Sequence, residues 1–170
     1  MWTGMKLVIM SDTHGDEEII ERVKSYHPDA DKMIHCGDSE LPHSHSAMQG
    51  MERVKGNCDG DSNYLEEILF QVNGECVYVT HGHLYDVKSS PMKLVYRAKE
   101  LGATIVCFGH SHILGAEYID GIFFINPGSL KKPRQIQEKS FVTLTISTTH
   151  FTLDCYDDNN NLMEQLFIER

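Results

Sequence analysis

The chain has 170 residues, of which 41% are hydrophobic, which is enough to bury one core but short for two. Fifteen Lys and Arg residues against 25 Asp and Glu residues give a net charge of −10, so a protein that binds nucleic acid through a basic surface is not expected. The longest apolar runs have the size of a strand, which argues against a membrane-spanning helix.

The five cysteines are scattered and never form a Cys-x-x-Cys pair, so neither a disulfide framework nor a zinc ribbon is expected. The first six residues lack the cationic and apolar regions of a signal peptide. We therefore expect a cytoplasmic protein without a membrane partner, in which residues 1–170 form a single domain.

The first part of the chain predicts a strand, a helix and a strand. Residues 6–10 are an apolar run that ends in a polar loop, residues 16–25 have helical periodicity, and residues 32–36 are a second apolar run. This order predicts a parallel sheet with a right-handed crossover. A short strand is predicted at 52–55.

The second part of the chain is richer in strands. Asn73-Gly74 is a strong hairpin signal between predicted strands at 68–72 and 76–79. A helix at 91–101 and a strand at 104–108 follow. Further strands are predicted at 117–119, 122–125, 141–146, 151–156 and 165–168. This strand count predicts one α/β domain with two sheets.

Five predicted strands end in a loop that contains glycine together with Asp, Asn or His. The polar residues in these loops are Asp12 and His14, Asp38, Asn57, His81 and His83, and His110 and His112. The carboxyl ends of parallel strands meet at one edge of a sheet, where α/β proteins bind ligands. Imidazole nitrogens mixed with carboxylate and amide oxygens suit Mn²⁺, Fe or Zn²⁺ better than Mg²⁺ or Ca²⁺. The pattern therefore predicts a transition-metal site at that edge.

These loops resemble the motifs of the calcineurin-like metallophosphoesterase superfamily. The matching motifs are Asp12-x-His14, Gly37-Asp38, Gly56-Asn57, His81 and Gly109-His110-x-His112, in the family's order. The small size, Gly-Asn-Cys-Asp at 56–59 and Asn-Pro-Gly-Ser at 126–129 are most similar to its small bacterial and archaeal phosphodiesterase branch. The resemblance implies a four-layer α/β-β/α sandwich with two facing mixed β-sheets and a metal site at the carboxyl ends of the strands.

The resemblance also implies two divalent metal ions, with Mn²⁺ expected and Fe, Ni²⁺ or Zn²⁺ as alternatives. The first ion would be held by Asp12, His14, Asp38 and His112, and the second by Asp38, Asn57, His81 and His110, with Asp38 bridging. Catalytic roles are expected for Asp38, Asn57 and Cys58. A hydroxide that bridges two ions about 3.5–4 Å apart would attack phosphorus directly, because the ions lower the pKa of bound water to about 7.

Cys58 is a departure from the family. Many members have a histidine after the Gly-Asn pair, where it contacts substrate or protonates the leaving oxygen. A thiol is a weak hydrogen-bond donor and stays mainly protonated at neutral pH. Two interpretations remain: Cys58 takes a modest version of that role, or it packs beneath the site.

Other polar residues near the motifs carry weaker expectations. His83 is a ligand, a substrate contact or a structural group, the last being favoured. The segment at 126–129 is expected to be a rigid turn that closes onto the metal loops. An exposed loop is favoured over phosphate steering for Lys131, Lys132 and Arg134, and a solvated position is favoured for His43 and His45.

The sequence thus predicts a metal-dependent phosphoesterase that acts on a small phosphate-ester substrate. A phosphodiesterase for small phosphodiesters or nucleotides is favoured over a phosphomonoesterase. The main alternative is a non-catalytic interaction scaffold that resembles the retromer subunit, in which the metal-binding histidines are largely lost; the retention of every candidate ligand here argues against it. The resemblance also implies a homo-oligomer, either a dimer or a tetramer.

Overall fold

Two mixed β-sheets form the centre of the fold in the structure, a computed structural model that describes residues 4–170; residues 1–3, part of the segment without signal-peptide features, lie outside this range. The first sheet has the strand order β11-β10-β9-β1-β2-β3. Its strands are β1 (Met5–Met10), β2 (Lys32–His35), β3 (Met51–Arg53), β9 (Ser140–Ile146), β10 (His150–Asp157) and β11 (Leu162–Glu169). Strands β1, β2 and β3 are parallel, whereas β9, β10 and β11 pair in antiparallel fashion.

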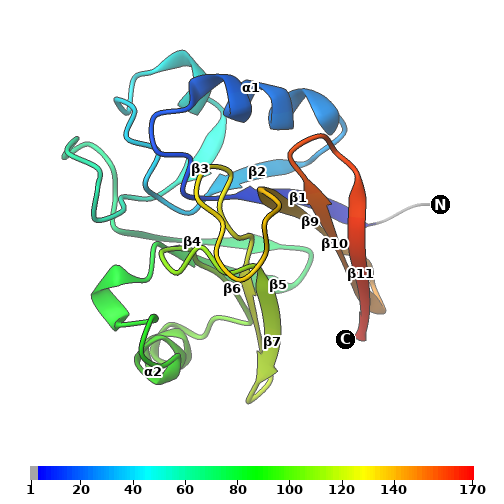
Figure 1. Cartoon of the computed structure of the whole chain (residues 1–170). Coiled ribbons are helices and arrows are strands. Elements are labelled where there is room, and N and C mark those ends of the chain that lie inside the picture. Colours follow the sequence, from blue (N-terminus) through cyan, green and yellow to red (C-terminus); the bar gives the residue numbers. More distant parts are fainter. Residues whose placement is uncertain (1–3) are drawn as a thin grey trace.

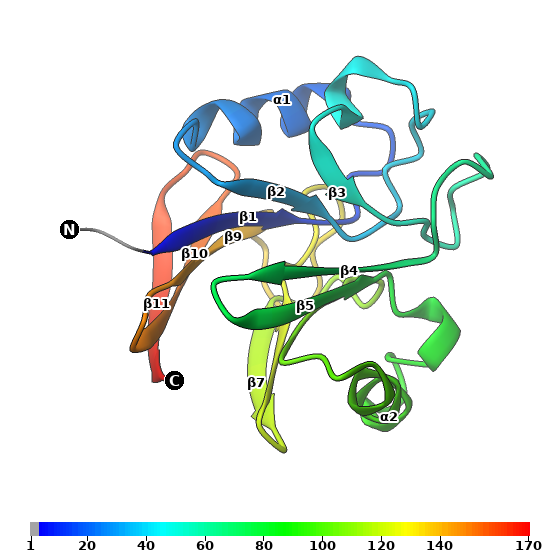
Figure 2. The ribbon, with the colours of Figure 1, turned by 180° about the vertical axis from the view of Figure 1, so that it is seen from behind.

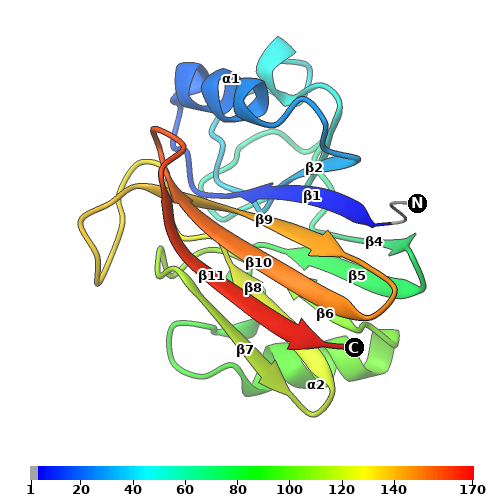
Figure 3. The same cartoon turned by 90° about the vertical axis from the view of Figure 1, so that its right-hand side faces the viewer.

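The second sheet has the order β4-β5-β6-β8-β7. Its strands are β4 (Glu67–Val72), β5 (Glu75–Thr80), β6 (Ile105–Cys107), β7 (Gly115–Ile119) and β8 (Ile122–Asn126). Strands β5, β6 and β8 are parallel, and β4 and β7 close the two edges as antiparallel hairpin partners. Figure 3 shows β9, β10 and β11 running across the second sheet, with β7 below them.

Helices cover the outer face of each sheet. Helix α1 (Glu17–Tyr26) lies on the first sheet and α2 (Met92–Leu101) lies on the second, and Figures 1 and 2 show the order α1, first sheet, second sheet, α2. The expected four-layer α/β-β/α sandwich is therefore confirmed. The sequence did not indicate the two single-turn 3₁₀ helices, η1 (Ser46–Met48) and η2 (His83–Tyr85).

The core has three layers because the central strands are buried on both faces. Leu7 and Ile9 of β1 face the second sheet, while Val8 of the same strand faces α1. Successive strand residues point to opposite faces, so one apolar run serves two layers. The third layer packs α2 against the second sheet through Leu94, Val95 and Ala98, together with strand residues such as Tyr78.

Local signals explain where the helices begin and end. The Asp16 side chain accepts a hydrogen bond from the Ile19 N–H at 3.1 Å and caps α1. Helix α2 ends at Gly102, whose φ of 69° is the left-handed conformation typical of a helix end. Among residues 4–170, no helix is both long enough and apolar enough to cross a membrane.

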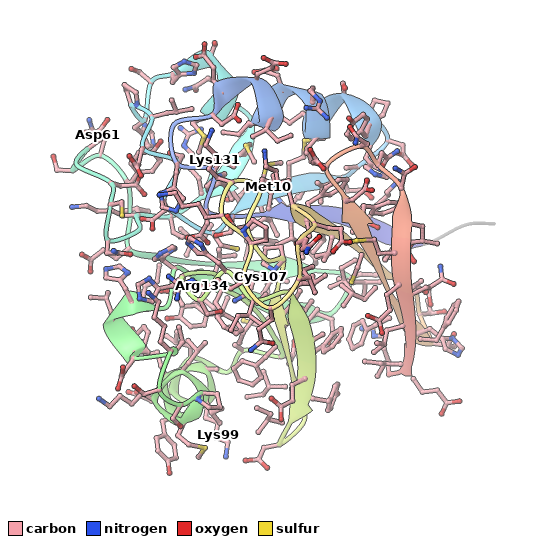
Figure 4. The ribbon with its side chains drawn as sticks, in the orientation of Figure 1. Met10, Asp61, Lys99, Cys107, Lys131 and Arg134 are labelled. Atoms are coloured by element: carbon pink, nitrogen blue, oxygen red, sulfur yellow. The ribbon has the colours of Figure 1, made fainter. Side chains whose placement is uncertain are left out.

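The parallel strands of both sheets end on one edge of the sandwich. Figure 4 labels Met10 and Cys107, the last residues of β1 and β6, near this edge, with Lys131 and Arg134 on a loop beside them. The loops that follow β1, β2, β3, β5 and β6 carry the predicted metal ligands. This edge is where the sequence predicted the site.

Candidate metal centre

The loop side chains form three overlapping groups of ligand atoms. In each group the atoms lie within 4.8 Å of one another. The groups are Asp12, His14 and His112; His14, Asp38 and Cys58; and Asp38, His81 and His110. Six of the seven expected ligands are thus brought together from segments up to a hundred residues apart.

Several close contacts within the cluster join nitrogen and oxygen atoms that would repel one another unless a proton or a cation lay between them. His14 Nε2 lies 3.3 Å from His112 Nε2, and Asp12 Oδ1 lies 3.1 Å from His112 Nε2. Asp12 Oδ1 is 3.8 Å from both His14 Nε2 and His81 Nε2. Asp38 Oδ2 is 3.2 Å from His81 Nε2. Lone pairs on nitrogen and oxygen therefore converge on a small volume.

Hydrogen bonds from the opposite ring nitrogen fix the orientation of three imidazoles. His81 Nδ1 donates to the Cys36 carbonyl at 2.7 Å, and His112 Nδ1 donates to the Lys132 carbonyl at 2.7 Å. His14 Nδ1 lies 2.6 Å from Glu40 Oε1. With the proton on Nδ1, the Nε2 lone pair of each ring faces the cluster. Outer partners of this kind orient the histidines of metal sites and raise their basicity.

Two atoms of the cluster are buried without a suitable hydrogen-bond partner among the described residues. They are Asp12 Oδ1 and His81 Nε2, and both side chains are fully buried. A buried polar atom without a partner costs about 1–3 kcal/mol, so such atoms call for an explanation. Divalent cations would satisfy both atoms, and the mixed nitrogen and oxygen donors suit a transition metal. The residues present therefore fit the metal that the family motifs imply.

The backbone is held in an unfavourable conformation at five of the expected ligands. Positive φ angles, between 43° and 70°, occur at Asp12, His14, Asp38, His110 and His112. Non-glycine residues visit this left-handed region rarely, and strain of this kind concentrates at functional sites. Backbone strain at these five residues therefore accompanies the orientation of their side chains toward the ligand cluster.

Glycines allow the ligand loops to approach one another. A Cβ atom on Gly56 would collide with Asp38 Oδ1 and would lie 2.5 Å from the Asp38 nitrogen. A Cβ atom on Gly109 would collide with Ser11 Oγ and would lie 2.5 Å from Asp12 Oδ2. The glycines of the Gly-Asn and Gly-His motifs are therefore needed for the space they leave beside the two aspartates.

Asp59 joins the loops after β2 and β3. Its carboxylate is buried and accepts three backbone N–H groups, from Asp38 at 2.8 Å, Glu40 at 2.8 Å and Gly56 at 2.7 Å. On the opposite side, Ser129 Oγ donates to the Asp12 carbonyl at 2.8 Å. These contacts hold the ligand loops in register with one another.

The charges of the cluster shift the pKa values of its members. Burial would raise the pKa of Asp38, but the His81 imidazole, 3.2 Å from Asp38 Oδ2, holds it well below its ordinary range. Burial would likewise lower the pKa of His81, and Asp38 and Asp12 raise it instead. The pKa of His110 falls to about 4, through burial first and then through the nearby His81. The carboxylates therefore stay ionised beside the imidazoles.

Asn57 and Cys58 lie at the exposed side of the cluster. Asn57 is exposed, and its Nδ2 contacts Cys58 Sγ at 3.6 Å. Cys58 is also exposed and groups with His14 and Asp38, which does not match the interpretation that it packs beneath the site. Desolvation of the sulfur and the negative charge of Asp38 raise the pKa of the Cys58 thiol to about 11.

The other polar residues named in the sequence analysis lie around the metal centre. His83 Nδ1 is buried without a hydrogen-bond partner among the described residues, and the His83 ring lies 5.4 Å from that of His81. The Asn126 side chain binds the Gly109 carbonyl at 3.3 Å and Ser111 Oγ at 2.9 Å, which agrees with a turn that closes onto a ligand loop. Exposed side chains are found for Lys131, Lys132 and Arg134, and His45 pairs with Glu17 at 2.5 Å.

Two residues of this centre were not singled out in the sequence. Glu40 carries no motif signal, because its role depends on a histidine 26 positions earlier. Asp59 belongs to the Gly-Asn-Cys-Asp segment. Its position three residues after Gly56 could have indicated a carboxylate that accepts a backbone N–H group of its own loop.

Comparison with known proteins agrees with this centre. The chain matches the calcineurin-like phosphoesterase superfamily domain over residues 5–149. It is 42% identical over 163 residues to the probable metallophosphoesterase YsnB of Bacillus subtilis, covering 95% of this chain and 96% of YsnB. It is 26% identical over 159 residues to the phosphodiesterase YfcE of Escherichia coli K12, covering 76% of this chain and 82% of YfcE.

Solved structures share the architecture. A predicted phosphoesterase from Streptococcus pneumoniae superposes with a TM-score of 0.94 at 32% identity over 100% of both chains. Vps29 from Cryptosporidium parvum shares the fold, with a TM-score of 0.79 at 17% identity over 98% of both chains. The match to the family domain and the identity to these phosphoesterases agree with the motifs and with the geometry of the centre. This chain belongs to the calcineurin-like phosphoesterase superfamily.

Proposed function

We propose that this protein is a dinuclear metal-dependent phosphodiesterase that hydrolyses small phosphodiesters or nucleotides. Its family gives the broader class, a metal-dependent hydrolase of phosphate esters. One observation carries the finer proposal: two groups of ligand atoms are connected by a third group, which shares His14 with one and Asp38 with the other. These groups are Asp12, His14 and His112 on one side and Asp38, His81 and His110 on the other.

The donor atoms support one ion in the group of Asp12, His14 and His112 and one ion in the group of Asp38, His81 and His110. Asp38 groups with His81 and His110 and also lies within 4.8 Å of His14 from the other set, and a carboxylate has two oxygens to share between ions, which supports its assignment as the bridging ligand. Asn57, next to Cys58 at the exposed side, would complete the second set. The mixed nitrogen and oxygen donors suit a transition metal, and the family resemblance favours Mn²⁺, with Fe, Ni²⁺ or Zn²⁺ as alternatives. When bound, two such ions supply a water with a pKa of about 7 and neutralise charge on the phosphate.

The residues of the chain bind and orient the reactants. Hydrolysis adds the oxygen of water to phosphorus and breaks the bond from phosphorus to the leaving oxygen, which takes up a proton. The products are a phosphate monoester and an alcohol. Cys58 Sγ, beside His14 and Asp38, is placed to donate a weak hydrogen bond to a substrate oxygen, because its thiol stays protonated at neutral pH.

Charge and the relatives both support a diester substrate. YfcE, which shares 26% identity with this chain, is named as a phosphodiesterase. A diester carries one negative charge, whereas a monoester carries up to two, and a protein with a net charge of −10 repels the monoester more strongly. The Vps29 likeness concerns the fold alone, and the converging ligand atoms favour an enzyme over a scaffold.

The test compares two chromogenic substrates. Protein loaded with Mn²⁺ is assayed on bis-p-nitrophenyl phosphate and on p-nitrophenyl phosphate. We expect a higher kcat/KM for the diester. Faster turnover of the monoester would overturn the substrate assignment, and a failure to acquire any transition metal would favour the scaffold.

Two substitutions test the ligand assignment. Asp38→Asn and His81→Ala should each remove most of the activity while the circular dichroism spectrum stays that of the parent protein. His150→Ala is the matched control, because His150 is an exposed histidine at the start of β10. Full activity in both ligand variants would refute the assignment.

A further inference from the structure

A pocket of about 440 Å³ lies beside the metal centre, on the side of the second sheet that α2 covers. Its walls come from the segment at 87–91 before α2, the loop after β6, and the strands β7 and β8. The loop that carries Lys131, Lys132 and Arg134, called the basic loop below, completes them. The lining side chains used below are Lys88, Phe108, Ser111, Glu117, Phe124 and Arg134. Its volume lies in the range of small-molecule sites.

Two observations connect this pocket to the ligand cluster. Ser111 lines the pocket and stands between His110 and His112 in the chain. The backbone N–H of Arg134 donates to the His112 carbonyl at 3.0 Å, so the residue at the mouth of the pocket is anchored to a metal-ligand loop. Lys88 lines the same pocket as Arg134, so two cationic residues border the pocket that adjoins the ligand loop.

The aromatic, apolar and charged side chains of the pocket walls suit an organic group that carries a phosphate. Phe108 and Phe124 are aromatic, and most of the other lining side chains are apolar, while Lys88, Arg134 and Glu117 give a local charge of about +1 in a protein with a net charge of −10. Aromatic faces stack on nucleobases, and a few polar groups at a mostly apolar wall fix the orientation of a ligand. Figure 4 shows Arg134 on the loop in front of this edge of the fold.

We propose that this pocket binds the nucleoside portion of a nucleotide phosphodiester while its phosphate lies at the metal centre, with Lys88 and Arg134 drawing the anionic substrate to the mouth. This inference rests on the proposed phosphodiesterase function. It adds a specificity site, built from the segment at 87–91, β7 and the basic loop, that the metal-binding motifs do not include.

Gly115 gives a direct way to fill the pocket. This residue begins β7 and pairs with Asn126, and a Cβ atom built on it meets no atom within 4 Å. Gly115→Phe therefore places a ring in the pocket without a collision at the backbone. Gln71→Phe is the matched control, because Gln71 is an exposed position on β4, the opposite edge strand of the same sheet.

The experiment measures a preference between two esters that share one chromophore. The substrates are the p-nitrophenyl ester of thymidine monophosphate and p-nitrophenyl methyl phosphate. The parent protein loaded with Mn²⁺ should favour the thymidine ester in kcat/KM by about tenfold or more, because the methyl ester leaves the pocket empty. Gly115→Phe should remove most of that preference, and Gln71→Phe should retain it. An absent preference in the parent, or an unchanged ratio in Gly115→Phe, would overturn the proposal.

A binding measurement separates failure of this proposal from failure of the proposed function. Isothermal titration with thymidine monophosphate, with inorganic phosphate as the reference, needs no turnover. Gly115→Phe should weaken binding of the nucleotide by about tenfold relative to phosphate, whereas Arg134→Gln should weaken binding of both anions. If neither ester is hydrolysed but nucleotide binding follows this pattern, the phosphodiesterase function fails and the pocket assignment stands. If both esters are hydrolysed and binding is unaffected, the pocket assignment fails alone.

Discussion

Asp59 is predicted to hold the metal centre together although it binds no metal. Its carboxylate accepts the backbone N–H groups of Asp38, Glu40 and Gly56 from two separate loops. In Asp59→Asn only one acceptor oxygen remains. Two of these bonds use Oδ2 and one uses Oδ1, so at least one of the three N–H groups then faces an amide NH₂ instead of an acceptor.

The size of the effect follows from these three bonds. Loss of one hydrogen bond to a charged acceptor costs about 1.5–3 kcal/mol. The two remaining bonds weaken because a neutral acceptor replaces a charged one, so the total loss in the free energy of unfolding is about 2–4 kcal/mol. For a domain of this size, that corresponds to a fall of roughly 4–16 °C in Tm.

Urea denaturation monitored by circular dichroism measures this change directly. Asp61→Asn is the matched control, since Asp61 also accepts two backbone N–H groups, from His43 at 2.8 Å and Asn63 at 2.9 Å, but is partly exposed to water. The control should lose less stability because water replaces the missing acceptor. A loss below about 0.5 kcal/mol in Asp59→Asn, the usual range of a surface substitution, would refute the reasoning.

Three further substitutions test the surroundings of the centre. Glu40→Gln removes the charged partner of His14 Nδ1 and should weaken Mn²⁺ binding about 10–100-fold by isothermal titration. Gly109→Ala places a methyl group against Ser11 Oγ and Asp12 Oδ2 and should cost about 1–3 kcal/mol in denaturant unfolding. Glu67→Gln, away from the metal, should lower stability at neutral pH. The bonds from Arg97 hold the pKa of Glu67 below its usual 4.5, so the stability it contributes is present above that pH and is lost as the pH falls through the lowered value.

Two of these variants have a control of the same chemical kind. Glu17→Gln alters a second histidine–carboxylate pair, with His45, and should leave Mn²⁺ affinity unchanged. Gly115→Ala should be tolerated because its Cβ atom meets nothing within 4 Å. Equal effects in Gly109→Ala and Gly115→Ala would contradict the packing argument. A stability difference between the parent and Glu67→Gln that persists unchanged in acid would contradict the role given to the Glu67 carboxylate.

Much of the fold was predictable because its strands carry strong local signals. Residues 7–10 are apolar on both faces, which matches their burial between α1 and the second sheet. Strand β11 begins at Leu162, three residues before its predicted start at 165. This strand is an edge strand with mostly exposed side chains, so it has no burial periodicity to read. The helix η2 depends on a tight turn at Gly82, with a φ of 109°, that no apolar pattern indicates.

The convergence of the ligand loops was also predictable, because parallel strands end on one edge of a sheet. The orientation of each imidazole was not. It is set by partners from distant segments, such as Cys36 for His81, Lys132 for His112 and Glu40 for His14. The pocket beside the centre could not be predicted either, since its walls come from five parts of the chain.

Metal content is the most direct test of the central claim that this cluster binds two divalent ions. Purified protein is incubated with Mn²⁺, freed of excess metal on a desalting column, and analysed by inductively coupled plasma mass spectrometry together with Asp38→Asn and His150→Ala. The account predicts two ions per chain in the parent and in His150→Ala, and a clear loss in Asp38→Asn, the proposed bridging ligand. A parent protein that retains no ion, or an Asp38→Asn variant that retains both, would contradict it.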